Sequence, residues 1–252
     1  MPLAMSLGSA SGRTGGKEVD VKMTYVLIPG AGGDAWYWHL VVPLLLERGD
    51  NVLAISLPAS DDSAGWAEYA DTIVDAIGDR TGLILVAQSL AGFSAPLVSG
   101  RVPVALLVLI NAMIPRPGET GGEWWSNTDQ QDAMQAQLEA LGLPVEAADD
   151  DATIYFHDVP SEVRAEAFRR GEPEQSWTPM TQAWPLDAWP DVPTRVLIGR
   201  DDRLFPASFQ RRIARERLAI EANEIEGGHL LALSRPRELV ERLESYRITL
   251  DR

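Results

Sequence analysis

The sequence predicts an α/β fold built on a doubly wound, mostly parallel sheet of six strands. Short, continuous apolar runs recur along the chain, as is typical of strands buried on both faces of a parallel sheet. Longer amphipathic stretches separate these runs, and this alternation predicts right-handed βαβ units. The length of 252 residues suits one domain of this kind.

The predicted elements follow the chain in order. The strands are the apolar runs at residues 25–28, 52–55, 83–86, 104–110 and 195–198, with a less apolar sixth at 219–225. The helices are the amphipathic stretches at residues 36–47, 64–77, 90–99, 207–217 and 237–246. Each helix falls between two strands or after the last one, as consecutive βαβ units require.

One long interval, residues 114–191, contains no strand-like run. It has helical patterns at 129–141 and 161–170 amid Pro, Gly and Trp residues. An insertion of this size after the fourth strand predicts a helical cap, or lid, over the carboxyl edge of the sheet, where such folds bind ligands. The core domain then comprises residues 23–113 and 192–252.

The first 22 residues, 1–22, are rich in Gly, Ser and Ala and are expected to form a flexible leader. A secretion signal is the alternative, but residues 1–16 lack a basic start and a continuous apolar stretch. No apolar run in the sequence approaches the ~18–20 residues that span a bilayer. We therefore expect a cytoplasmic protein.

Charge and composition exclude several classes of function. The chain has 37 acidic and 22 basic residues, a formal net charge of −15, which disfavours binding to nucleic acid or to an anionic membrane surface. It has no cysteine, so disulfides, thiolate metal sites and a cysteine nucleophile are excluded. Most of the net negative charge lies in the predicted cap, which holds sixteen acidic and four basic residues.

A candidate nucleophile follows the third predicted strand, in the segment Ala87-Gln88-Ser89-Leu90-Ala91-Gly92. A strand that turns directly into a helix needs small flanking residues, here Ala87 and Ala91, because larger side chains would strike the neighbouring backbone. Such a turn exposes Ser89 in a strained conformation at the amino end of the next helix. The alternative is an ordinary serine N-cap.

A nucleophilic serine requires a base, and the base requires an acid that orients it. Of the three histidines, His229 directly follows the last predicted strand and is the preferred base. His39 lies on an amphipathic stretch beside tryptophans, where packing is the expected role, and His157 lies in the predicted cap. After the fifth strand, either Asp201 or Asp202 is suitable as the acid.

Acyl transfer also needs N–H donors for the developing oxyanion. The backbone N–H of Leu90, directly after Ser89, is one candidate. The glycine-rich loop 29–34 after the first strand supplies the other, with Ala31 as the preferred donor. This loop matches neither a dinucleotide-binding fingerprint nor a P-loop, and Asp34 is expected to cap the following helix.

These segments resemble the α/β-hydrolases, in particular the small-cap branch that contains plant methylesterases and hydroxynitrile lyases. The resemblance spans residues 25–246 and is carried by Ile28-Pro29-Gly30-Ala31 with Trp36-Tyr37-Trp38-His39, by Ala87 to Gly92, by Asp202 to Pro206 with Phe209-Gln210, and by Glu226 to His229. It implies a six-stranded core, the triad Ser89–Asp202–His229, and oxyanion donors at Ala31 and Leu90. The family pattern Gly-x-x-Asp-x-x-x-Pro matches Asp202 without a shift.

Departures from this branch bear on the reaction. Its lyases have a threonine in the first loop and a lysine after the catalytic histidine, where this chain has Gly30 and Leu230. Cyanohydrin cleavage is therefore disfavoured. Epoxide hydrolases and haloalkane dehalogenases of the same fold use an aspartate nucleophile, and the serine at position 89 argues against those activities.

The expected function is a serine hydrolase that cleaves a carboxylic ester of a small, neutral, apolar or aromatic molecule through an acyl-enzyme, with no cofactor and no metal. The alternatives are a lactone or thioester hydrolase, a cofactor-free lyase on the same triad, or a hydrolase-like binding protein with little turnover. Expected substrate contacts are Gly30, Trp124, Trp125 and His157, although tryptophans at this density are more typical of packing. The expected partner is the ester itself, without nucleic acid or membrane, and a homodimer is left open.

Overall fold

The computed structural model describes residues 22–250, so the predicted leader lies outside the described residues apart from Lys22. Within that range the chain forms one sheet of six parallel strands in the order β2-β1-β3-β4-β5-β6. The strands are β1 (Thr24–Ile28), β2 (Asn51–Ala54), β3 (Leu83–Gln88), β4 (Val104–Ile110), β5 (Thr194–Gly199) and β6 (Asn223–Ile225). This arrangement confirms the predicted doubly wound α/β fold.

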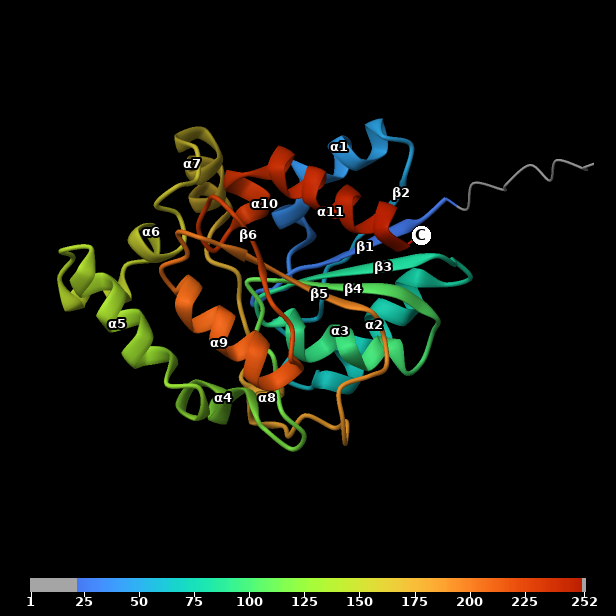
Figure 1. Ribbon diagram of the computed structural model, residues 1–252, viewed down its shortest axis with the longest axis horizontal. Coiled ribbons are helices and arrows are strands. Elements are labelled where there is room, and N and C mark those ends of the chain that lie inside the picture. Colours follow the sequence, from blue (N-terminus) through green and yellow to red (C-terminus); the bar gives the residue numbers. More distant parts are fainter. Residues whose placement is uncertain (1–21, 251–252) are drawn as a thin grey trace, which may run out of the picture.

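Both faces of the sheet are buried, and successive residues of each strand point to opposite faces. In β4, Leu107 and Leu109 belong to one buried cluster, whereas Leu106, Val108 and Ile110 belong to the other. The first cluster is covered by α2 (Trp66–Ile77), α3 (Ala91–Ser99) and α9 (Ala207–Leu218), and the second by α1 (Val41–Glu47), α10 (Leu231–Ser234) and α11 (Pro236–Leu250) (Figure 1). This double burial explains why the strands read as continuous apolar runs.

The segment between β4 and β5, residues 114–191, is helical and is called the cap segment below. It contains α4 (Gly121–Asn127), α5 (Gln130–Ala140), a 3₁₀ helix η2 (Val145–Asp149), α6 (Asp151–Ile154), α7 (Ser161–Arg170) and α8 (Thr178–Thr181). Most of these elements gather beyond one end of the sheet (Figure 1). Helices α5 and α7 match the two helical patterns in the sequence.

Two predicted elements differ in extent from the observed ones. The expected helix 36–47 is a 3₁₀ helix, η1 (Ala35–Trp38), followed by α1. Because Pro43 has no N–H to donate to the carbonyl four residues earlier, the helix restarts with this proline in its first turn. The sixth strand begins only at Asn223, since Ala219, at φ 56°, ends α9 instead.

The helices of the described range are amphipathic or short. None of them combines the length and the apolar character that crossing a lipid bilayer requires.

Candidate active site

Ser89 occupies a sharp turn between β3 and α3. Its φ of 51° lies in the left-handed region, which a non-glycine residue adopts only at a cost in conformational energy. The turn is held by its carbonyl, which accepts hydrogen bonds from the N–H groups of Gly92 and Met113. Gly92 has no alternative here, because a Cβ would lie 1.7 Å from the carbonyl oxygen of Met113. The glycine at position 92 is therefore required by a steric limit.

The three predicted triad residues meet at the carboxyl edge of the sheet. Nε2 of His229 lies 3.1 Å from Oγ of Ser89, and Nδ1 of His229 lies 2.8 Å from Oδ2 of Asp202. His229 is 2 % exposed and Asp202 is fully buried. A buried carboxylate beside Nδ1 holds the imidazole with its other nitrogen toward the hydroxyl, which is the geometry that general-base activation of a serine requires.

The Asp202 carboxylate is held at both oxygens. Its Oδ1 accepts hydrogen bonds of 2.9 Å from the N–H groups of Leu204 and Phe205, and its Oδ2 accepts one of 3.2 Å from Nε2 of Gln210. Asp201 points elsewhere and accepts a hydrogen bond from the N–H of Gly227 at 3.0 Å. Asp202 therefore holds the ring of His229, whereas Asp201 holds the backbone of Gly227, two residues before that histidine.

Two buried amide side chains connect the loops of this site, and sequence reasoning missed both. Asn111, at φ 43°, donates to the carbonyls of Gly228 and His229, and its Oδ1 accepts from the N–H of Gly199. Gln88 accepts from the N–H of Gly30 at 3.1 Å and donates to the carbonyl of His229 at 3.5 Å. Gln88 is the last residue of the apolar strand β3, and Asn111 directly follows the apolar strand β4. An amide residue at such a position is the sequence signal that could have identified them.

The predicted oxyanion donors lie beside Ser89. A Cβ added to Gly30 would fall 2.8 Å from Cβ of Ser89, so loop 30–33 packs directly against the serine. Within the described residues, the backbone N–H groups of Ala31 and Leu90 donate to no protein acceptor. Leu90 also stands at the amino end of α3, where the helix dipole favours negative charge.

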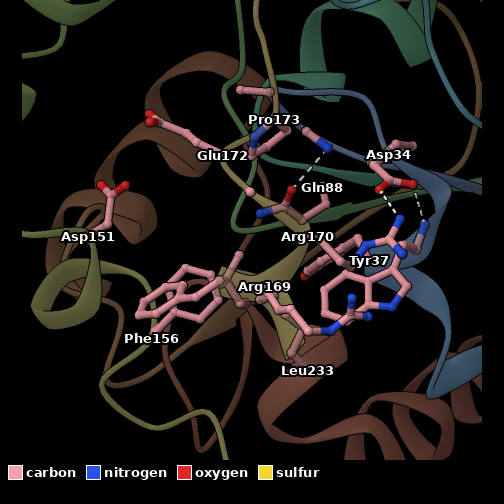
Figure 2. A pocket seen from close by; sticks show the side chains of 18 residues that line it. Asp34, Tyr37, Gln88, Asp151, Phe156, Arg169, Arg170, Glu172, Pro173 and Leu233 are labelled. Atoms are coloured by element: carbon pink, nitrogen blue, oxygen red, sulfur yellow. Dashed lines mark hydrogen bonds and ion pairs between the residues drawn. The ribbon is translucent and has the colours of Figure 1, made fainter. Parts of the chain in front are cut away.

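A cavity of about 720 Å³ opens next to this loop; Ser89 and His229 do not line it themselves, but their chain neighbours Gln88 and Leu230 do. The core contributes Gly30, Ala31 and Gln88 to its lining, and the cap segment contributes Phe156 and residues 167–173 (Figure 2). Residues of the core and of the cap segment therefore line the same cavity.

The charges around the cavity are arranged unevenly. On one side Arg170 forms an ion pair with Asp34, 2.9 Å between Nη2 and Oδ2, and on the opposite side Asp151 and Glu172 lie at the rim (Figure 2). Burial and the negative charges of Glu172 and Asp150 raise the pKa of Asp151. Asp34 also caps η1 through the N–H of Trp36, as the sequence predicted.

The four residues expected to contact substrate are placed differently from one another. Gly30 lines the cavity, but Trp124 does not reach it, since its side chain is fully buried and donates to the carbonyl of Ile114. Trp125 packs against Trp124 and Phe205 and is not among the residues that line this cavity. The prediction for Trp124 is therefore wrong, because its ring is buried against Phe205 and Phe209, between the cap segment and α9. Substrate contact by Trp125 stays a prediction.

The other two histidines lie outside the cavity lining. His157 packs against Gly228, the residue before His229. A Cβ added to Gly228 would lie 2.7 Å from Nε2 of His157. His39 stacks on Trp36 and its Nδ1 lies 2.8 Å from that residue's carbonyl, so its expected packing role is confirmed. Among residues 22–250, no cluster of three or more His, Asp or Glu side chains is arranged to hold a metal ion.

Comparison with known proteins identifies the family. Residues 25–242 match the family described as "Alpha/beta hydrolase family". Norfluorocurarine synthase 1 of Strychnos is 24 % identical over 249 residues, covering 85 % of this chain and 91 % of that protein. Methylesterase 3 of Arabidopsis thaliana is 25 % identical over 137 residues, covering 49 % and 52 %. The crystal structure of polyneuridine aldehyde esterase shares the fold, with a TM-score of 0.73, 19 % identity and coverage of 90 % and 99 %. The relatives thus include methylesterases, as the motifs predicted, and the chain belongs to the α/β-hydrolase family.

Proposed function

We propose that this protein hydrolyses a carboxylic ester through an acyl-enzyme on Ser89. The observation that supports this most directly is the unbroken hydrogen-bonded series from Oγ of Ser89 through His229 to Asp202. A serine hydroxyl is a poor nucleophile until a base removes its proton, and Nε2 of His229 is within reach of that proton.

In the first half of the reaction, Oγ of Ser89 attacks the ester carbonyl carbon while its proton passes to Nε2 of His229. The carbonyl oxygen becomes an oxyanion that the N–H groups of Ala31 and Leu90 stabilise, and each such donor is worth ~3–4 kcal/mol in the transition state. The intermediate collapses, the bond to the alcohol oxygen breaks, and His229 gives its proton to the leaving alcohol. Asp202 stabilises the imidazolium in between.

In the second half, His229 takes a proton from a water molecule, and the resulting hydroxide equivalent attacks the acyl-enzyme carbonyl. The bond to Oγ then breaks, Oγ recovers the proton from His229, and the carboxylic acid leaves. No group beyond these residues and water is needed to balance the reaction.

The cavity supports a small apolar or aromatic ester as the substrate class. Its volume of about 720 Å³ is in the range of pockets for small organic molecules. Its walls include the apolar or aromatic side chains of Tyr37, Phe156, Phe168 and Leu233. Leu230, directly after His229, also lines it, so no lysine stands at the position that hydroxynitrile lyases use.

The experiment is to measure hydrolysis of p-nitrophenyl butyrate and labelling by a fluorophosphonate probe, in the wild type and in Ser89→Ala. We expect labelling and multiple turnovers in the wild type, and a fall of at least ~10³-fold in kcat with loss of labelling in the variant. Ser94→Ala is the matched control, because Ser94 is a buried serine of α3, the helix that follows Ser89, and its hydroxyl bonds the carbonyl of Ala91. Retained turnover in Ser89→Ala would contradict the mechanism, and labelling without turnover in the wild type would favour a binding protein.

A further inference from the structure

The loop that carries the proposed oxyanion donor has three of its four amides already occupied. The N–H of Gly30 donates to Gln88, that of Gly32 to Gln175, and that of Gly33 to the carbonyl of Gly30. Among residues 30–33 only the N–H of Ala31 is left without a protein acceptor, and Ala31 is exposed to the cavity. The direction of this amide therefore depends on what holds its neighbours.

The acceptor for Gly32 comes from the cap segment. Oε1 of Gln175 lies 3.0 Å from the N–H of Gly32. Nε2 of the same side chain donates to the hydroxyl of Tyr69 at 3.1 Å and to the carbonyl of Ser176 at 2.9 Å. Both ends of the amide are thus in use, so the oxygen is committed to Gly32.

Two further contacts join the same parts of the chain. Gly32, at φ 81°, packs so closely on Pro173 that a Cβ there would fall 2.5 Å from the proline ring. Arg170 pairs with Asp34 and stacks over the Trp36 ring at 5.1 Å from its centroid, on the side of the cavity shown in Figure 2. Residues 170–175 of the cap segment therefore hold loop 30–34 along its length.

We propose that Gln175 is a positioning residue for the oxyanion site, because it fixes Gly32 and thereby aims the N–H of Ala31 at the reacting carbonyl oxygen. This inference rests on the proposed function. The side-chain amide of Gln175 is bonded to Gly32, Tyr69 and Ser176, so it acts through the loop and not on the substrate. The cap segment then contributes to stabilising the transition state as well as to enclosing the ligand.

The test compares Gln175→Met, which keeps the length but removes the acceptor, with Gln175→Glu, which keeps an acceptor oxygen. With p-nitrophenyl butyrate we expect Gln175→Met to lower kcat about 10-fold, with KM within about two-fold, less than the ~10²–10³ that follows outright loss of a donor. Affinity for a trifluoromethyl ketone, whose adduct with Ser89 carries the oxyanion, falls by a similar factor. Gln175→Glu recovers part of the kcat and of the ketone affinity, because it restores the acceptor for Gly32 but not the donor to the carbonyl of Ser176.

Thr178→Val is the matched control, since Thr178 also bonds the cap segment to the core, through the carbonyl of Asp62 at 2.7 Å, but does not touch loop 30–34. It is expected to leave kcat and ketone affinity unchanged. An equal loss in Thr178→Val, or a rise in KM at unchanged kcat in Gln175→Met, would overturn the inference. Wild-type hydrolysis that Ser89→Ala abolishes, together with an unaffected Gln175→Met, would reject the role of Gln175 while leaving the proposed function intact.

Discussion

Oδ2 of Asp202 lies 2.8 Å from Nδ1 of His229, although Asp201, with the same carboxylate, is the adjacent residue. Asp201 binds the N–H of Gly227 instead. The two residues lie in a turn, in which the N–H of Asp202 donates to the carbonyl of Gly199 and that of Asp201 to the carbonyl of Gly227. Their side chains have different partners, and only the Asp202 carboxylate is bonded to the ring.

This difference predicts unequal effects of the same substitution. Asp202→Asn removes the charge that stabilises the imidazolium and favours the wrong tautomer, so kcat for p-nitrophenyl butyrate should fall about 10⁴-fold. Asp201→Asn retains an acceptor for Gly227 and should change kcat by less than about 10-fold. Steady-state kinetics of the two variants settle the assignment, and comparable losses would show that it is incorrect.

The base of the cap segment is joined to α9 by a buried ion pair between Glu119 and Arg217. The two side chains are 4 % and 2 % exposed, and Nη2 of Arg217 lies 3.0 Å from Oε1 of Glu119. Glu119→Gln leaves the guanidinium buried without its countercharge, so the free energy of unfolding should fall by about 3–5 kcal/mol. Urea denaturation measures this.

A double variant is the control for that pair. In Glu119→Gln with Arg217→Met neither charge remains, so the combined loss should be smaller than the sum of the single losses. Strict additivity would mean that the two side chains do not stabilise the protein through each other.

The carboxyl groups of Asp50 and Glu244 interact, and this predicts that the free energy of unfolding depends on pH. Burial and the neighbouring Glu244 carboxylate raise the pKa of Asp50 to about 6, against the opposing charges of Arg247 and Arg48. A raised pKa means that the folded state favours the protonated form. The resulting stabilisation is complete below the unfolded pKa of 3.8 and is lost as the pH rises through about 6.

Above about pH 6 the ionised Asp50 carboxylate destabilises the folded state, and Asp50→Asn removes this cost. At about pH 8 the variant should be more stable than the wild type by about 1 kcal/mol, allowing for solvent screening, or about 3 °C in Tm. Near pH 4 the difference should disappear. Thermal melts across this range test it, and a Tm difference that does not vary with pH would argue against the shared titration.

Charged side chains at the cavity predict discrimination among esters by charge. Arg169 and Arg170 also line it, but each is paired with a carboxylate, Glu166 and Asp34 respectively. Asp151 and Glu172 lie at the rim, and the cap segment as a whole holds sixteen acidic and four basic residues. We expect kcat/KM at low salt to be about 3–10-fold lower for p-nitrophenyl hemisuccinate than for the neutral p-nitrophenyl valerate. The difference in kcat/KM between the two esters should become smaller in about 0.5 M salt. It should also become smaller in the double variant Asp151→Asn/Glu172→Gln. Equal values at low salt would contradict it.

The strands and most helices were predictable because burial on both faces of a parallel sheet produces continuous apolar runs. The helix expected at residues 36–47 was interrupted by the requirements of Pro43, and the sixth strand was shortened because Ala219 ends α9. In both places a local backbone constraint overrode the hydrophobic pattern.

By itself, the sequence determined that Ser89 and His229 each follow a strand. Parallel strands present all their carboxyl ends at one edge of the sheet, so the two residues come to the same edge. Only the tertiary structure decided that Asp202 faces the histidine, that Trp124 packs in the core, and that Gln175 reaches Gly32 across 143 residues of chain. These contacts depend on side-chain direction and on how distant segments pack together. Neither property is contained in the local pattern of residue types.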